Sequence, residues 1–213
     1  MAENTTGYPA TLSISYPEKP LDKTTTLFRL FTVIPIAIIL LLIIGGSYQW
    51  ETEAEEVVYQ LGSGGGMVFL SLVLMILFQQ KYPRWWFDWN VALTKFAYRV
   101  IVYIGLMRDE YPSTDDEQAV HINLEYPDVK KDLNRWLPLV KWFLAIPHYI
   151  VLAFLSIAAV VCVIVAWFNI LFTGQYPEGL FNFVSGVLRW SLRVAAYAGL
   201  MITDTYPPFS LDA

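Results

Sequence analysis

The sequence predicts an all-α membrane protein: a tandem repeat of two helical hairpins, with about four transmembrane helices. Each hairpin is followed by a predicted amphipathic interfacial helix, and short cytoplasmic β-strands are also predicted. Two observations favour this fold class. Hydrophobic residues make up 56% of the 213 residues and charged residues only 15%, and the apolar residues lie in long blocks that are nearly free of charge. Several motifs also occur twice, in the same order, in the two halves of the chain.

Composition excludes several classes of protein. About a quarter of the residues in a soluble domain are charged, so the shortage of charge here is large. The net charge of -5 and the pI near 5.0 argue against nucleic acid as a partner. The single cysteine, Cys162, can form no internal disulfide, which excludes a disulfide-rich secreted scaffold. Residues 1–26 are polar and lack the basic and apolar regions of a signal peptide, so we expect no cleaved signal peptide.

The first hairpin is predicted from two apolar runs. Leu27–Tyr48 is long enough for a crossing, which needs about 20 apolar residues. Its one charged residue, Arg29, lies near an end, from which we expect the side chain to reach the lipid headgroups. Met67–Phe78 is shorter but wholly apolar, and it predicts a second crossing at about 64–80. The segment 47–66 is acidic and rich in glycine, and we interpret it as an exposed extracytoplasmic loop.

The second hairpin is predicted from a longer apolar block, Leu139–Phe172. A straight helix of that length would be roughly 50 Å long, whereas the hydrocarbon core is about 30 Å thick. In the first half the acidic loop interrupts the corresponding region, and insertions are tolerated at exposed turns rather than within crossings. We therefore predict a tight turn near Ser156–Val160, with crossings at about 136–157 and 159–174. The last segment is short enough to be re-entrant instead.

Motifs shared by the two halves define the repeat. Tyr82–Met107 aligns without a gap with Tyr176–Met201, and both segments contain a Tyr-Pro pair, an Arg-Val pair and a Gly-Leu-Met end. An Ile-Pro pair and an earlier Tyr-Pro pair precede them in each half. The predicted organisation is a first membrane repeat at 1–112, a linker at 113–118 and a second membrane repeat at 119–213.

The segments that follow the hairpins, 85–107 and 179–201, carry basic residues four positions apart. Such residues share one helix face, so each predicted helix has a basic stripe opposite aromatic and aliphatic residues. We favour helices that lie in the interface, because arginines at the centre of a membrane cost several kcal/mol. The alternative is that these helices also span, which would give three crossings per repeat and inverted copies. The stripe residues are Lys95, Arg99, Arg189 and Arg193.

The four stripe residues are the candidate lipid-headgroup site. They occupy equivalent positions, so a pseudo-twofold arrangement would gather them at the cytoplasmic surface, where such clusters hold anionic lipids. The alternative is that they only orient the helices or pair with Asp88, Asp109 and Asp204. All 14 Lys and Arg lie in segments that this topology puts on one side of the membrane. The positive-inside rule then predicts a multi-pass protein of the cell (inner) membrane, with both termini in the cytoplasm.

Alternating residues at Thr11–Tyr16 and Val120–Tyr126 predict two half-buried strands, which we expect to pair with each other against the amphipathic helices. Pro208–Leu211 is a third candidate strand. His121 and His148 have no second ligand at metal-binding spacing, and nucleophile and phosphate-binding motifs are absent from the sequence. We therefore predict no catalytic residue, no metal and no cofactor, and we expect His148 to be hydrogen-bonded within the helical bundle.

A set of motifs in the second half carries a family resemblance. The motifs are Arg135–Trp142, Ala145–His148, Ala166–Phe168, Leu171–Gly174, Tyr176-Pro177, and Val187–Trp190 continuing to Tyr206–Phe209. Over roughly residues 120–212 this pattern resembles the DUF4389 family of prokaryotic multi-pass membrane proteins. The first half is a diverged copy, which lacks the histidine after its Ile-Pro pair and adds the acidic loop. The resemblance implies a multi-pass membrane protein and brings no assigned activity.

The expected function is that of a non-enzymatic integral membrane protein. We expect a scaffold or accessory subunit of a larger membrane complex, because the predicted crossings contain almost no polar residues. Its expected partners are membrane lipids, anionic ones among them, and other membrane subunits or a second copy. A small-solute transporter or channel is the alternative, and it would need polar groups at mid-membrane, for which Ser71, Ser156 and Asn169 are the candidates. An enzyme acting on lipid at the interface is a third hypothesis, without an identifiable acid–base pair.

Overall fold

The computed structural model describes residues 7–44, 71–114 and 116–212. This part of the chain is mostly helical and contains a two-stranded sheet. In chain order the elements are β1 (Ala10–Ile14), α1 (Lys23–Ile44), the π-helical turn η1 (Met75–Gln79), α3 (Arg84–Ile104), β2 (Val120–Leu124), α4 (Val129–Asp132), the 3-10 turn η2 (Leu137–Leu139), α5 (Lys141–Leu144), α6 (Ile146–Thr173), α7 (Glu178–Val194) and the π-helical turn η3 (Ala195–Gly199). Two stretches, Lys23–Leu41 of α1 and all of α6, are long and apolar enough to cross a membrane.

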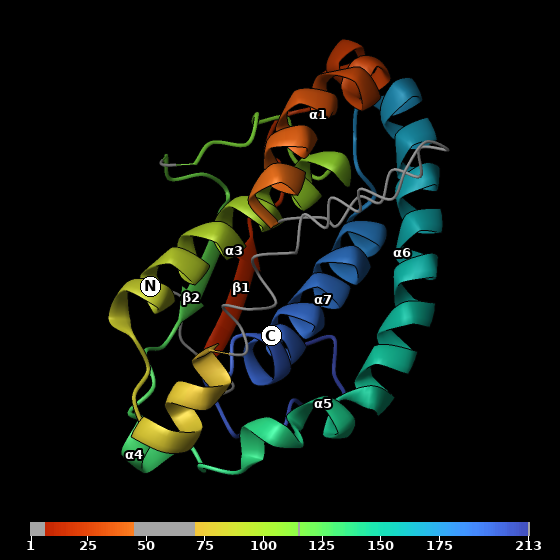
Figure 1. Cartoon of the computed structure of the whole chain (residues 1–213). Helices are drawn as coiled ribbons and strands as arrows, with labels where there is room; N and C mark the ends of the chain where they lie inside the picture. Colours follow the sequence, from red (N-terminus) through yellow and green to blue (C-terminus); the bar gives the residue numbers. More distant parts are fainter. Residues whose placement is uncertain (1–6, 45–70, 115, 213) are drawn as a thin grey trace, which may run out of the picture.

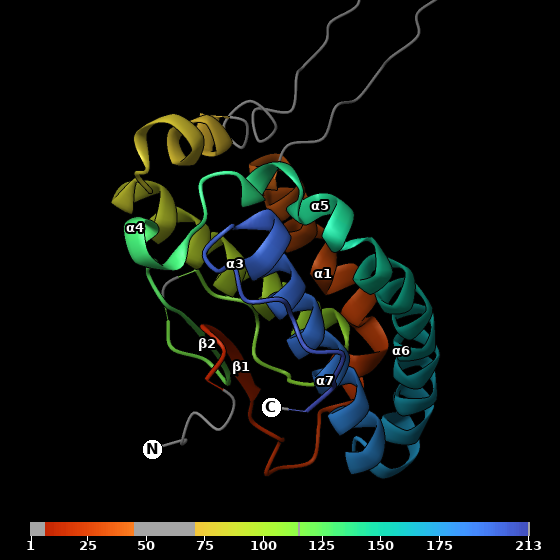
Figure 2. The ribbon, with the colours of Figure 1, turned by 90° about the horizontal axis from the view of Figure 1, so that it is seen from below.

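The elements stack outward from the sheet, as Figures 1 and 2 show. α7 lies between β1 and α6, and α3 contacts both β2 and α1. α1 and α6 contact each other on the far side from the strands. The strand of the first half therefore packs on a helix of the second half, and the strand of the second half packs on a helix of the first. The two halves are interleaved around a common core.

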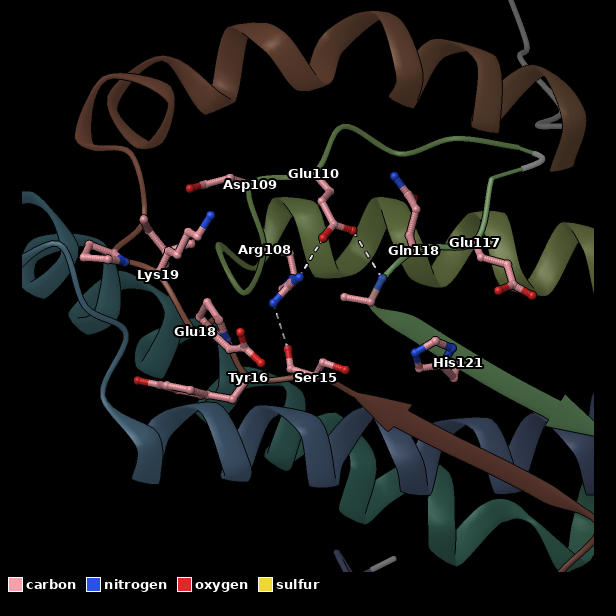
Figure 3. Close-up of a pocket in the computed structure, with 14 residues that line it drawn as sticks. Ser15, Tyr16, Glu18, Lys19, Arg108, Asp109, Glu110, Glu117, Gln118 and His121 are labelled. Atoms are coloured by element: carbon pink, nitrogen blue, oxygen red, sulfur yellow. Dashed lines mark hydrogen bonds and ion pairs between the residues drawn. The ribbon is translucent and has the colours of Figure 1, made fainter. Parts of the chain in front are cut away.

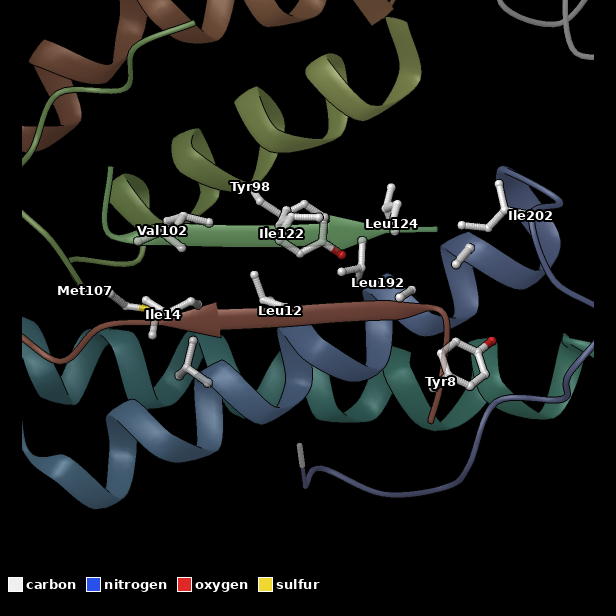
Figure 4. Close-up of a cluster of buried hydrophobic side chains, with 14 of the residues drawn as sticks. Tyr8, Leu12, Ile14, Tyr98, Val102, Met107, Ile122, Leu124, Leu192 and Ile202 are labelled. Carbon is white, nitrogen blue, oxygen red and sulfur yellow. The ribbon is translucent and has the colours of Figure 1, made fainter. Parts of the chain in front are cut away.

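The sheet confirms the predicted strands and their pairing. β1 and β2 are antiparallel, with Ala10 opposite Leu124 and Ile14 opposite Val120. Alternate side chains of both strands are buried, as the alternating sequence requires. Figure 4 shows how these side chains meet Tyr98 of α3 in one hydrophobic cluster. The core thus joins the sheet to the two amphipathic helices, which is the packing that we expected.

The prediction of a third strand at Pro208–Leu211 is wrong. This segment has no regular structure, because arginine side chains of α7 take its main-chain carbonyl groups. Arg193 donates to the carbonyl of Ser210 at 2.6 Å, and Arg189 donates to that of Leu211 at 3.2 Å. An ideal Cβ on Gly186 would lie 2.9 Å from Leu211 atoms, so glycine is what lets the tail approach α7 this closely.

The predicted turn near Ser156–Val160 is also wrong. α6 is one continuous helix of 28 residues, so crossings at 136–157 and 159–174 do not form. The physical reason is local: neither proline nor glycine interrupts the chain between Pro147 and Gly174. Gly174 ends the helix in the left-handed conformation, with φ of 76°. At 1.5 Å per residue α6 is about 42 Å long.

The first predicted hairpin lies only in part within the described residues. α1 begins at Lys23, before the predicted start of the crossing, and the Asp22 carboxylate accepts a hydrogen bond from the main-chain nitrogen of Thr24 at 2.8 Å. The acidic loop 47–66 and most of the crossing predicted at 64–80 lie outside the described residues. Residues 71–79, at the end of that segment, are helical.

Helices occupy both segments predicted to be amphipathic. α3 covers most of 85–107, and α7 with η3 covers most of 179–201. One residue of each basic stripe faces inward, however: Arg99 is 8% exposed and Arg193 is 4% exposed, whereas Lys95 and Arg189 are half-buried. Arg99 and Arg193 are buried because α3 and α7 are covered on two sides, by the strands on one and by α1 or α6 on the other.

Candidate functional site

Arg29, on α1, is a buried cation. Its side chain is 3% exposed and forms an ion pair with Asp109. One terminal nitrogen donates to the carbonyls of Tyr103 at 3.0 Å and Arg108 at 2.6 Å, and the guanidinium carbon lies 4.4 Å from the centroid of the Tyr103 ring. The expectation that Arg29 reaches the headgroups is therefore wrong, because the end of α3 holds it inside. We call Arg29, Tyr103 and Asp109 the first cation cluster.

Lys141, on α5, is a second buried cation. Its ammonium nitrogen lies 2.8 Å from a carboxylate oxygen of Asp204, donates to the carbonyl of Thr203 at 2.7 Å, and lies 5.1 Å from the ring centroid of Tyr197. The side chain is fully buried. Burial lowers the pKa of Lys141, and the interaction with Asp204 opposes this effect without cancelling it. We call Lys141, Tyr197 and Asp204 the second cation cluster.

The two clusters use equivalent sequence positions. Each cation lies five positions before an Ile-Pro pair, each tyrosine two before Gly-Leu-Met, and each aspartate two before a Tyr-Pro pair. The tyrosine of each cluster also packs edge-on against the tyrosine of that Tyr-Pro pair, at 5.6 Å and 5.7 Å. The two clusters were not predicted from the sequence. The equal spacing of their residues from the repeated motifs would have indicated that the two sets are equivalent. They tie the start of each apolar region to the segment after the amphipathic helix.

Two of the predicted headgroup residues, Arg99 and Arg193, are already engaged. Arg99 donates to the carbonyl of Ser113 at 2.7 Å. Arg193 donates to the carbonyls of Ser210 at 2.6 Å and Asp212 at 3.1 Å. Burial lowers the pKa of Arg193. Both guanidinium groups therefore bind the chain segment that follows their own helix.

The other two predicted headgroup residues differ from each other. Arg189 donates to the carbonyl of Leu12 on β1 at 3.1 Å and to that of Leu211 at 3.2 Å, so it joins α7 to the sheet and the tail. Burial lowers its pKa. Lys95 is half-buried on α3 and has no hydrogen-bond or ion-pair partner within the described part of the chain. Asp109 and Asp204 pair with the cation clusters instead of the stripes, and Asp88 pairs with Arg84.

A polar cavity of about 670 Å³ lies where β1 ends and β2 begins. Figure 3 shows Arg108 and Glu110 inside it, joined by an ion pair of 2.6 Å. Burial raises the pKa of Glu110, but hydrogen bonds from Arg108 and from the main-chain nitrogen of Ala119 outweigh it, so the pKa is lowered. Asp109 of the first cation cluster also lines the cavity. Further charged or titratable lining residues are Glu18, Lys19, Glu117 and His121.

A family model described as "Domain of unknown function (DUF4389)" matches residues 136–210. The match supports the assignment of these residues, in the second half of the chain, to DUF4389. No curated protein and no solved structure matches the chain. The DUF4389 residues include α6, α7 and the whole second cation cluster. The description assigns no activity, so chemistry must be inferred from the side chains.

Within the DUF4389 residues, His148 is buried among aromatic rings. Its Nδ1 accepts a hydrogen bond from the Trp190 indole at 3.0 Å, and its ring stacks on Phe209 with centroids 4.0 Å apart. The expected hydrogen bond within the bundle is confirmed. In the first half, Ile36 follows the Ile-Pro pair and packs with Phe96, so the same position is apolar there. Among the described residues, no group of three His, Cys, Asp or Glu is placed to hold a metal ion.

Proposed function

We propose that the protein is a non-enzymatic membrane protein, a scaffold or accessory subunit whose outer helices contact lipids and neighbouring subunits. The observation that carries the proposal is the outer face of α6. In a 28-residue helix without a single charged residue, side chains as large as Phe154 and Phe172 are 70% and 79% exposed. Soluble monomers rarely expose apolar patches larger than a few hundred Å². A face of this kind is stable when acyl chains or another subunit cover it.

The outer face of α1 extends this surface. Leu30 and Phe31 are 77% and 70% exposed, and α1 packs beside α6. The charged and hydrogen-bonding groups of the sheet and of the polar cavity lie on the other side of the stack, as Figure 2 indicates for the strands. This separation of an apolar face from a polar one supports membrane association, because each face meets the solvent that suits it.

The finer proposal is a tandem duplication. Contacts at equivalent positions support it. In each half, the tyrosine just after the strand donates a hydrogen bond to the main-chain carbonyl of a Tyr-Pro tyrosine in the other half. The ring of the donating tyrosine also packs edge-on against the phenylalanine five positions after that Tyr-Pro tyrosine, with ring centroids 5.0 Å and 5.1 Å apart. The residues are Tyr16, Tyr176 and Phe181 for one set, and Tyr126, Tyr82 and Phe87 for the other. These contacts, together with the matched cation clusters, favour two copies of one ancestral unit. We accordingly keep the predicted repeats at 1–112 and 119–213.

We also propose that both termini lie on the cytoplasmic side of the cell (inner) membrane. The pairing of β1 with β2 holds the N-terminal segment to the chain after the linker, and Arg193 holds the C-terminal tail to α7. The support for this proposal is the distribution of Lys and Arg, which favours the cytoplasm for the segments that carry them. We propose contact with anionic headgroups for Lys95 alone, because it is the stripe residue without a hydrogen-bond or ion-pair partner among the described residues.

Extraction and co-purification test the proposal. The protein is expressed at native level, its membranes are washed with alkaline carbonate, and partners are isolated in mild detergent and identified by mass spectrometry. We expect the protein in the carbonate-resistant pellet, with lipid and stoichiometric partner subunits. A matched pair of variants sharpens the result: Phe154→Gln alters the outer face of α6, and Asn182→Gln alters an exposed position of α7.

The outcomes separate the hypotheses. We expect Phe154→Gln to reduce partner or lipid recovery and Asn182→Gln to leave it unchanged. Release of the protein by carbonate would overturn membrane integration. Isolation without partners, combined with solute flux in reconstituted vesicles, would favour the transporter or channel over the scaffold.

A further inference from the structure

An apolar groove lies between α1 and α6, beside the first cation cluster. Its volume is about 330 Å³, which is within the range of pockets that hold small ligands. Its apolar lining is formed by Leu30 and Val33 of α1, Ile104 and Leu106 at the end of α3, and Val163 and Ile164 of α6. Leu30 and Ile164 are 77% and 51% exposed, so the groove is continuous with the outer face proposed to meet the membrane.

Thr26 and Arg29 also line the groove, and each has one buried polar atom without a partner within the described part of the chain. Thr26 is 1% exposed, and its hydroxyl has no hydrogen-bond partner within the described part of the chain. Nε of Arg29 also has no hydrogen-bond partner within the described part of the chain, whereas its terminal nitrogens bind Asp109 and main-chain carbonyls. A buried polar group without a partner is destabilising, and a hydrogen bond from a ligand relieves that cost. Two such donors beside apolar walls are a site for a ligand that has an acceptor oxygen on an apolar body.

The charge balance of the first cation cluster indicates that the acceptor oxygen of the ligand is uncharged. Asp109 already neutralises Arg29, so a carboxylate or a phosphate in the groove would bring an uncompensated negative charge into an apolar space. An uncharged carbonyl oxygen accepts from both donors without that penalty. The outer face supplies such a group directly, because each acyl chain of a diester phospholipid begins at an ester carbonyl.

We propose that the groove holds one acyl chain of a membrane diester phospholipid, and that its ester carbonyl accepts hydrogen bonds from the Thr26 hydroxyl and from Nε of Arg29. This inference rests on the proposed membrane function, because the lipid enters from the outer face of α1 and α6. Thr26 is the specificity-determining residue, since its hydroxyl has no other partner within the described part of the chain.

A comparison of ester and ether lipids tests the inference. The delipidated full chain is equilibrated in detergent with diester or diether phosphatidylethanolamine of equal chain length, and bound lipid is measured by native mass spectrometry. The diether lipid lacks the carbonyl. We expect the diester lipid to be retained about tenfold better, which corresponds to about 1.4 kcal/mol. Thr26→Val should remove most of that preference, whereas Thr24→Val, at an exposed position of the same helix, should keep it.

Each outcome decides a separate point. Equal retention of the two lipids by the unaltered chain would overturn the carbonyl contact, and so would an unchanged preference in Thr26→Val. Ile164→Trp, which fills the groove from a half-exposed position, should abolish the bound lipid, and normal binding by this variant would place the lipid elsewhere. Co-purification of a quinone or a peptide in the groove would also overturn the assignment. Flotation with vesicles is measured in parallel: a chain that floats without ester preference refutes this inference alone, and one that does not float refutes the proposed function.

Discussion

The ion pair between Lys141 and Asp204 provides the sharpest test of the packing. Asp204→Asn leaves a fully buried ammonium group without its counter-charge, while the hydrogen bond to the carbonyl of Thr203 is kept. Removing one partner of a buried pair costs about 3–5 kcal/mol. Asp204 is 21% exposed, so water screens part of the charge. We therefore expect a loss near the lower limit, about 3 kcal/mol in the free energy of unfolding.

The double variant Lys141→Met/Asp204→Asn tests whether the isolated charge causes the loss. An apolar side chain of similar length replaces a buried ion pair at little cost, although the carbonyl of Thr203 then loses its donor. We expect the double variant to recover about 2 kcal/mol relative to Asp204→Asn. Denaturant unfolding in detergent, followed by tryptophan fluorescence, measures each variant. A double variant that is no more stable than Asp204→Asn would refute the reasoning.

Lys141 also makes the free energy of unfolding depend on pH, and the direction of its pKa shift predicts the sign of that dependence. Burial lowers the folded-state pKa of Lys141 below its ordinary 10.5. Between those two values the unfolded chain binds more protons, so the free energy of unfolding rises with pH. In Asp204→Asn the opposing interaction is lost, the pKa falls further and the rise begins at lower pH. Subtracting the profile of Lys141→Met removes the contribution of the tyrosines, and a flat difference profile would contradict the assignment.

Three further substitutions test the contacts of α7 and α6. Arg193→Gln should release the tail at 208–212, with a loss of about 1–3 kcal/mol, and amide exchange of the tail measures it; unchanged protection would show that the arginine does not hold it. Gly186→Ala places a Cβ 2.9 Å from Leu211 and should cost about 1–3 kcal/mol, whereas an unchanged melting temperature would contradict the close approach. Gly174→Ala, at φ of 76°, should cost about 1–2 kcal/mol, measured by thermal unfolding, and a stability equal to that of the parent would argue against the left-handed end of α6.

The strands and the amphipathic helices were predictable because their signals are local. Alternation at Thr11–Tyr16 and Val120–Tyr126 indicates which side chains point inward, and both segments end at a Tyr-Pro pair that stops the strand. The two strands were expected to pair with each other because a short strand is not stable on its own. The predicted turn in α6 was wrong because no helix breaker lies between Pro147 and Gly174, and membrane thickness alone does not interrupt a helix.

The candidate site was less predictable, because it depends on which surfaces the neighbouring elements cover. A helical pattern places Arg99 and Arg193 on one face of their helices, but it does not say that this face meets the protein interior. Arg29 near the end of an apolar run has the pattern of a residue that reaches the headgroups, and the structure instead pairs it with Asp109, far away in sequence.

The sequence by itself determined the apolar character of α1 and α6, the two basic amphipathic helices, the two alternating strands and a DUF4389 pattern in the second half, but it wrongly divided α6 into two crossings. These features depend on side chains a few positions apart, and local periodicity records them. Only the tertiary structure decided that the strands exchange between the halves, that one residue of each basic stripe turns inward, and that Arg29 and Lys141 are buried in matched ion pairs. The reason is that burial and charge pairing belong to contacts between distant segments, and such contacts exist only once the chain has folded.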